Sequence, residues 1–442
     1  MTNDVAPLTH KRVLRVALPI VLSSATVPLL GAVDLGVVGQ TGQAVPIAAV
    51  GIGSVVLTTI YWVFGFLRMG TTGLVGQAEG EGDTAEVSAF LTRALLIAVG
   101  AGLALIALQS VLFAFALSLS PASKEVENLA TAYLGIRIWS APAAISVYAL
   151  TGWLVAMERT GRVLILQLVM NGTNIVLDIW FVLGLGWGVE GVAIATVIAE
   201  VAGALVGVYL CAPAFRNPAW RDWKRISDRA KLLRMALVNS DILVRSAALL
   251  AIFTSFTFFS ARFGDETLAA NQVLMQFLTL SAFALDGFAH AAETLVARAV
   301  GRKDVARLRR AAWLCGLWGA VSAFVLVVAF ALFGRQLIEL MTTAPNVRLE
   351  AEAYMVWVVI SPLLAVWAFT LDGIFIGATR GPDLRNMMLI SMVIYLGAVW
   401  ILMPSFGNHG LWLALLISLV ARGVTLGWRY PKLEASVASP KA

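Results

Sequence analysis

Residues Ala17–Gln40 read ALPIVLSSATVPLLGAVDLGVVGQ, an apolar run with two prolines, Pro19 and Pro28, and one carboxylate, Asp34. The run is long enough to cross a bilayer, because about 20 helical residues span roughly 30 Å of hydrocarbon. A charged Asp at that depth costs about 2.5 to 3.5 kcal/mol and usually faces a partner or a water-filled cavity. Each proline weakens the helix hydrogen bonds around it. We therefore expect a helix that bends easily beside a functional Asp34.

The composition excludes a soluble globular protein, since 60% of the 442 residues are hydrophobic and only 13% are charged. The first apolar run is too long for a cleavable signal and lacks a small-residue exit, so we expect it to stay in the membrane. The net charge of +6 comes from short loops between apolar runs, which favours membrane topology over nucleic-acid binding. Cys211 and Cys315 lie far apart in apolar runs and are expected to pack, without forming a disulfide or metal site.

Apolar runs of spanning length predict an all-α integral membrane protein with twelve transmembrane helices. The predicted spans are Val13–Gly39, Val45–Met69, Phe90–Leu117, Leu134–Met157, Val163–Gly186, Val189–Ala212, Met235–Phe263, Leu268–Ala292, Ala311–Gly334, Tyr354–Ala378, Asn386–Pro404 and Gly410–Trp428.

The basic residues are distributed unevenly between the two sides that these spans define. Most of the 32 Lys and Arg fall on the side of the N-terminus, which predicts that both termini are cytoplasmic. The few basic residues assigned to outside loops are Lys124, Arg137, Arg262, Arg335 and Arg348.

The chain repeats itself. VLRVALP at Val13–Pro19 returns as LLRMALV at Leu232–Val238, and the segment from Ser140 returns from Ile360, with Pro142 against Pro362 and Gly161 against Gly381. In the loops, Gly80 and Asp83 match Gly301 and Asp304. We expect two six-helix bundles, residues 1–215 and 235–442, joined by a cytoplasmic linker over 216–234. They would be parallel repeats about an axis along the membrane normal, with a substrate site between them near mid-membrane.

Polar residues in the first half fall on one helix face. Asn171, Asn174 and Asp178 are spaced i, i+3 and i+7, and Thr196 and Glu200 lie one turn apart on the next helix. Together with Asp34 they predict a polar cluster if these helices adjoin. The alternative is hydrogen-bond glue between helices, which is worth only about 0.6 to 2 kcal/mol per contact. Two carboxylates sharing low-dielectric space favour a proton-binding site instead.

The second half carries a different set. Asp241 and Arg245 lie one turn apart and predict an intramembrane ion pair, either structural or functional. Asp286 and Asp372 lie deep in their spans, whereas Glu293 is expected at a solvated rim. The residues predicted to line a substrate cavity are Gln167, Asn171, Glu200, Asp241, Arg245, Asp286 and Asp372.

No pattern in the sequence predicts an enzyme. There is no G-x-x-x-x-G-K-[ST] phosphate loop, and the three His residues form no catalytic or zinc pattern. We therefore expect no cofactor and no metal site.

Several segments together resemble the multidrug and toxic compound extrusion (MATE) transporters, and more narrowly their DinF-like branch. These are PLLGAVDLGVVG, RMGTTGLVGQAEGEGD, NIVLDIWFVLGLG, GVAIATVIAE and LDGIFIGATRG, and the likeness covers nearly the whole chain. The resemblance implies an antiporter that exchanges H⁺, or alternatively Na⁺, for amphipathic, often cationic compounds. It would be a monomer in the inner membrane of a bacterium or archaeon.

The resemblance also implies roles for individual residues. The cation site of the N-terminal lobe maps onto Asp34, Asn174, Asp178 and Thr196, and the hinge proline of the first helix maps onto Pro19. In the NorM-like branch an acidic residue lies in the seventh helix, where this chain has Arg245; the carboxylate of the tenth helix is matched by Asp372. One alternative function is a flippase for a lipid-linked precursor, which would need a wide basic cavity. The other is an intramembrane enzyme, for which we find no nucleophile, base or metal set.

Overall fold

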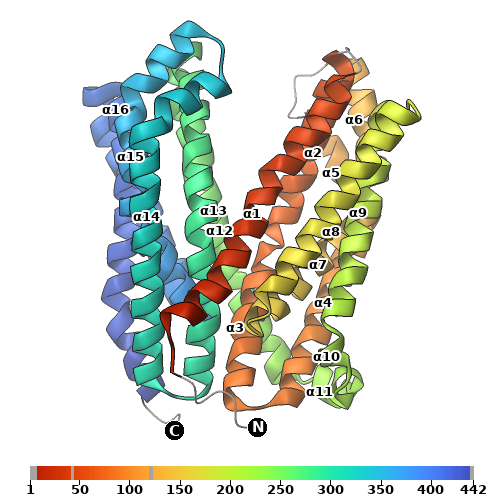
Figure 1. Cartoon of the computed structure of the whole chain (residues 1–442), viewed down its shortest axis with the longest axis vertical. Coiled ribbons are helices and arrows are strands. Elements are labelled where there is room, and N and C mark those ends of the chain that lie inside the picture. The colour runs from red at the N-terminus through yellow and green to blue at the C-terminus, as the bar shows by residue number, and fades with distance from the viewer. Residues whose placement is uncertain (1–6, 41–43, 119–122, 439–442) are drawn as a thin grey trace. The chain divides into compact units, whose positions relative to one another are not determined.

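The computed structural model describes residues 7–40, 44–118 and 123–438, without the side chains of residues 27–32 and 35. The ring of Pro28 therefore lies outside the described part. Every regular element in these ranges is a helix (Figure 1), so the all-α prediction is confirmed.

The chain divides into two compact units. Unit 1 comprises Met1–Val21 and Arg234–Ala442, and unit 2 comprises Leu22–Leu233. The first helix, α1 (His10–Gly39), contributes its beginning to unit 1 and the remainder to unit 2.

Unit 2 is built from α-helices with short 3₁₀ and π segments between them. They are α2 (Ala44–Val63), α3 (Gly65–Glu81), α4 (Thr84–Ala107), α5 (Gln109–Ser118), α6 (Lys124–Arg137), η1 (Ile138–Ser140), α7 (Ala141–Ala156), α8 (Thr160–Asp178), η2 (Ile179–Gly184), α9 (Gly188–Leu210), α10 (Ala212–Phe215), η3 (Pro218–Arg221) and α11 (Trp223–Ile226).

Unit 1 consists mainly of longer helices. They are α12 (Arg229–Ser260), which begins just before the unit boundary, η4 (Ala261–Phe263), α13 (Asp265–Gly301), α14 (Val305–Met341), α15 (Pro345–Gly377) and α16 (Gly381–Ala438).

Ten helical segments of the described chain are long and apolar enough to cross a membrane, judged by length and composition. The twelve predicted spans correspond to these ten together with α1 and a division of α16 into two. The division falls at Gly407, where φ is 55° and ψ is −133°. Only glycine adopts this backbone conformation readily, because the Cβ of any other residue would clash with its own backbone.

A buried amide pair fixes this break in α16. Asn271 of α13 donates to the Asn408 side-chain oxygen at 2.8 Å, and Asn408 donates back at 3.0 Å. The Asn271 oxygen also accepts the Trp412 indole N–H at 2.8 Å, and the Trp412 ring packs edge-on against Phe256. Buried amides need such partners, so the network holds the second half of α16 against α13.

The internal repeat is visible in how helices cross. A Cβ at Gly152 of α7 would collide with the carbonyl oxygen of Arg68 in α3, and a Cβ at Gly373 of α15 would collide with that of Ala289 in α13. The sequence separation between Gly152 and Gly373 equals that between Arg68 and Ala289. Asp83 and Asp304 have the same separation. Each of these aspartates accepts the backbone N–H three residues on. This sequence offset is one residue longer than the offset between Gly161 and Gly381, so the structural repeat is shifted by one residue relative to that pairing.

We predict that one methyl group at either crossing glycine destabilises the protein, because the opposing carbonyl belongs to a helix backbone and cannot rotate away. Gly152→Ala and Gly373→Ala should each cost about 1 to 3 kcal/mol, measured as a lower thermal unfolding midpoint in detergent. Gly100→Ala is the control, since nothing lies within 4 Å of a Cβ at that position of α4. Equal behaviour of all three variants would contradict the close crossing.

Candidate functional site

The polar face of α8 is buried in unit 2. Asn171, Asn174 and Asp178 are 5%, 1% and 0% exposed. Their spacing places them along one side of the helix, and that side packs toward α9 and the second part of α1.

Asp34 of α1 meets Asp178 of α8. Asp34 is 7% exposed, and the two carboxyl groups adjoin. Among the described residues, no donor bonds to either oxygen of Asp178 or to Oδ1 of Asp34. Within the same described part, neither carboxylate forms an ion pair. Two adjoining carboxylates without a counter-ion repel each other strongly in a low-dielectric surrounding.

Amide and hydroxyl groups surround this acid pair. Asn174 donates to the Thr196 hydroxyl at 3.1 Å, and Thr196 donates to the carbonyl of Val192 at 2.9 Å. Asn174 Oδ1 accepts no bond from the described residues, so it is a further buried oxygen near the pair. Asn171 lies one turn away and donates to Thr26 of α1 at 2.8 Å.

Gln167 continues the same helix face one turn before Asn171. Its side chain is half-buried, and its amide oxygen is enclosed without a donor in the described chain. The structure therefore extends the polar face of α8 toward Gln167.

An arginine that was predicted to lie in an outside loop lies next to this cluster. Arg137 ends α6, is 8% exposed and donates to Glu200 of α9 at 3.0 Å. Its guanidinium also lies 5.8 Å from the centre of the Tyr133 ring, and its charge acts on both Asp34 and Asp178. The loop assignment was wrong, because the chain continues directly from Arg137 into the helical elements η1 and α7. The predicted span Leu134–Met157 already contained this arginine, and that was the available signal.

Unit 1 buries its central carboxylate between two arginines. Asp372 of α15 is 4% exposed and pairs with Arg245 of α12 and with Arg422 of α16. Arg422 Nε donates to Asp372 Oδ1 at 3.0 Å. The carboxylate is therefore neutralised by cations from two neighbouring helices.

The predicted ion pair between Asp241 and Arg245 is wrong. Arg245 pairs with Asp372, and Asp241 instead accepts Arg385 of α16 at 2.7 Å. Asp241 lies against Gly381 at the start of α16, where Arg385 reaches it. Contacts between helices decided both pairings, although the spacing along α12 allowed the local one.

The remaining candidates lie in unit 1. Asp286 of α13 is half-buried, and its charge acts on Arg422. Glu293 is 2% exposed, so the prediction of a solvated position was wrong. Pro19 is half-buried and lies inside the unbroken helix α1, just before the boundary between the units.

A family model, MatE, matches the chain twice, over residues 19–180 and 242–401. The chain belongs to the MatE family. The two matches begin in α1 and α12 and cover the two halves of the repeat.

Curated relatives agree with this MatE assignment. The chain is 37% identical over 427 residues to DNA damage-inducible protein F of Escherichia coli (strain K12), covering 95% of this chain and 92% of that protein. It is 28% identical over 457 residues to the probable multidrug resistance protein NorM of Xylella fastidiosa (strain 9a5c), covering 94% and 90%.

Solved MATE structures share the fold. A MATE protein in the bent conformation matches with a TM-score of 0.88 at 20% identity, covering 97% of both chains. An outward-facing multidrug resistance MATE family transporter matches with a TM-score of 0.85 at 20% identity, covering 96% of both. The resemblance to MATE transporters is thus confirmed. MatE proteins are membrane transporters that handle small organic substrates, so the prediction that this chain is not an enzyme is also confirmed.

The Arg137–Glu200 pair generates a first prediction for this site. Removing one member of a buried ion pair costs about 3 to 5 kcal/mol, because the other charge remains without a counter-ion. Arg137→Gln and Glu200→Gln should each lower the thermal unfolding midpoint, and the double variant should recover most of the loss. Additive losses in this double-mutant cycle would show that the two side chains act independently.

A second prediction compares the two central carboxylates. Asp372→Asn leaves Arg245 and Arg422 buried without an anion, so it should cost about 3 to 5 kcal/mol of stability. Asp34→Asn removes a repulsion and should cost less than about 1 kcal/mol. Unfolding midpoints of the purified variants in detergent measure both, and an Asp34→Asn variant as unstable as Asp372→Asn would refute the contrast.

Proposed function

We propose that this MatE protein is a cation-coupled antiporter that exports amphipathic, often cationic organic compounds by alternating access. The observation that carries the proposal is the buried Asp34–Asp178 pair, which forms no ion pair in the described chain and in which both oxygens of Asp178 and Oδ1 of Asp34 accept no hydrogen bond from described residues. The printed names of the multidrug resistance relatives support the substrate class.

The chemistry of the pair explains why it would bind a cation. Two unit charges 4 Å apart repel by about 4 kcal/mol at an effective dielectric constant of 20. One proton between the carboxyl groups removes this repulsion and supplies the missing hydrogen bond. The enclosed oxygens of Asp34, Asp178 and Asn174, together with the Thr196 hydroxyl, are also ligands that Na⁺ accepts. We propose H⁺ as the coupling ion, with Na⁺ as the alternative.

Coupling follows from the position of Asp34 on α1. Protonation removes the charge that favours water around the pair, so α1 can repack more closely against α8. Pro19 lacks a backbone N–H and weakens the helix hydrogen bonds around it, which makes it the natural hinge. If protonated and drug-bound states need different positions of α1, each ligand weakens binding of the other, and exchange results.

We propose that residues 1–215 and 235–442 form the two lobes, which residues 216–234 join in sequence. The Lys and Arg bias supports cytoplasmic termini in the inner membrane of a bacterium or archaeon. We expect a monomer, because each chain carries both halves of the repeat.

We predict that Asp34→Asn abolishes transport driven by a pH gradient, because an amide cannot exchange a proton. Purified protein in proteoliposomes, loaded with a fluorescent organic cation, should release the dye when a proton gradient alone is imposed. Asp34→Asn should lower this rate at least tenfold, on the scale of removing a group that transfers protons, while inserting normally.

The control is Asp265→Asn, which changes an exposed carboxylate in the first turn of α13 and should leave the rate unchanged. A rate that follows an imposed sodium gradient instead would make Na⁺ the coupling ion. Full transport by Asp34→Asn, or movement of lipid-linked headgroups without dye, would overturn the proposal.

A further inference from the structure

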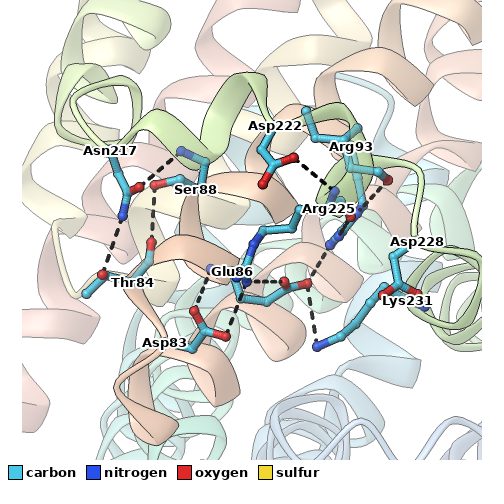
Figure 2. Close-up of polar contacts among 12 residues, drawn as sticks. Asp83, Thr84, Glu86, Ser88, Arg93, Asn217, Asp222, Arg225, Asp228 and Lys231 are labelled. Atoms are coloured by element: carbon cyan, nitrogen blue, oxygen red, sulfur yellow. Dashed lines mark hydrogen bonds and ion pairs between the residues drawn. The ribbon is translucent and has the colours of Figure 1, made fainter.

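The segment predicted to be a linker is docked onto unit 2 by a buried arginine (Figure 2). The side chain of Arg93 in α4 is fully buried and donates to Glu86 at 2.6 Å. It also donates to the carbonyl of Ile226 at 3.0 Å and to the carbonyl of Arg225. One guanidinium therefore holds both an acidic side chain of its own helix and the backbone of α11.

Side chains of the segment add to this attachment. Arg225 donates to Glu86 at 3.2 Å and to Asp83 at 3.5 Å, and Lys231 lies 3.7 Å from Glu86. Asn217 donates to Thr84 at 3.4 Å. Because α4 holds the segment at both ends and in the middle (Figure 2), residues 217–231 form a fixed part of unit 2.

The docked segment has two different sides. Ala219 and Ile226 are buried against unit 2, at 8% and 4% exposure. Between them Trp220 and Trp223 are 36% and 66% exposed. Two tryptophans of the segment are thus exposed, while its small and aliphatic residues pack against unit 2.

The segment's basic residues divide in the same way. Arg225 and Lys231 are engaged with Glu86, whereas four exposed cations form no ion pair with described residues. These four are Arg216, Arg221, Lys224 and Arg229. The two exposed acids, Asp222 and Asp228, each accept backbone N–H groups and cap the following helix. The outer side is therefore positively charged, with cations interleaved between the tryptophans.

We propose that this outer face, Arg216–Lys224, binds the headgroups of anionic phospholipids. The segment follows directly on α9, whose last turns expose Leu205, Val208 and Tyr209, as expected of a helix surrounded by lipid. The face accordingly lies where the hydrocarbon ends and the headgroups begin. Tryptophan favours this interface, and each Lys or Arg near it is attracted by anionic lipid.

The proposal commits to lipid as the occupant because exposed tryptophans and exposed cations alternate along one docked segment. A free phosphate would use the cations alone, whereas a phospholipid offers a phosphate to Arg221 and Lys224 and an interfacial layer to Trp220 and Trp223. The docking by Arg93 fixes these groups before the lipid arrives, so little ordering is needed on binding.

The test uses the full-length protein in detergent and measures its thermal unfolding midpoint as phosphatidylglycerol or phosphatidylcholine is added. A ligand that binds only the folded state raises the midpoint. We expect phosphatidylglycerol to raise it more than phosphatidylcholine does, and we expect about 1 M NaCl to remove the difference by screening.

Neutralising two of the cations should remove the preference for anionic lipid. Arg221→Gln/Lys224→Gln should weaken binding of phosphatidylglycerol on the order of 30-fold, since each cation contributes about fivefold. Both side chains are exposed, so the midpoint without lipid should equal that of the wild type. The matched control is Lys124→Gln/Arg262→Gln, which removes two exposed cations elsewhere and should keep the lipid response.

Three results would overturn the proposal. They are an unchanged phosphatidylglycerol response in Arg221→Gln/Lys224→Gln, an equal loss of response in the control variant, and the same stabilisation by inorganic phosphate alone. The last result would assign the cations to a free anion.

Discussion

A carboxylate among apolar helices must be neutralised, hydrogen-bonded or protonated, and this constraint shapes both units of the protein. In unit 1, Asp372 is neutralised by Arg245 and Arg422 from two different helices. In unit 2, Asp34 and Asp178 adjoin, and the nearest cation, Arg137, is already paired with Glu200. The first arrangement is a fixed charge network that ties helices together. The second leaves both oxygens of Asp178 and Oδ1 of Asp34 without a hydrogen-bond donor among the described residues, which is why we propose the coupling reaction there.

The two halves share a scaffold and differ in their charges. Gly152 and Gly373 allow equivalent helix crossings, and Asp83 and Asp304 begin equivalent helices. Their surroundings then diverge: the helix that begins after Asp83 carries Glu86 and Arg93, which hold the segment leading to α12. A repeated backbone can therefore carry a pair of carboxyl groups without an ion-pair partner in one half and a neutralised network in the other.

The N-terminal site joins three levels of structure. The spacing of Asn171, Asn174 and Asp178 gives one polar helix face, the packing of α1 and α9 encloses it, and Glu200 orients the nearest cation. A single helix supplies the polar face, but it supplies neither the enclosure nor the partner of the nearby arginine. The acid pair itself exists only because α1 and α8, which are distant in sequence, pack together.

The sequence by itself determined the helices, the repeat and the family, because apolar length, Pro and Gly positions and motif order are local properties of the chain. It also identified Asp34, Asn174 and Asp178, since carboxylates and amides inside apolar runs are rare enough to be noticed. Only the tertiary structure decided the partners: Arg137 with Glu200, Arg245 with Asp372, and Asp241 with Arg385. The physical reason is that a long, flexible arginine side chain can reach several carboxylates, and the packing of helices distant in sequence selects among them.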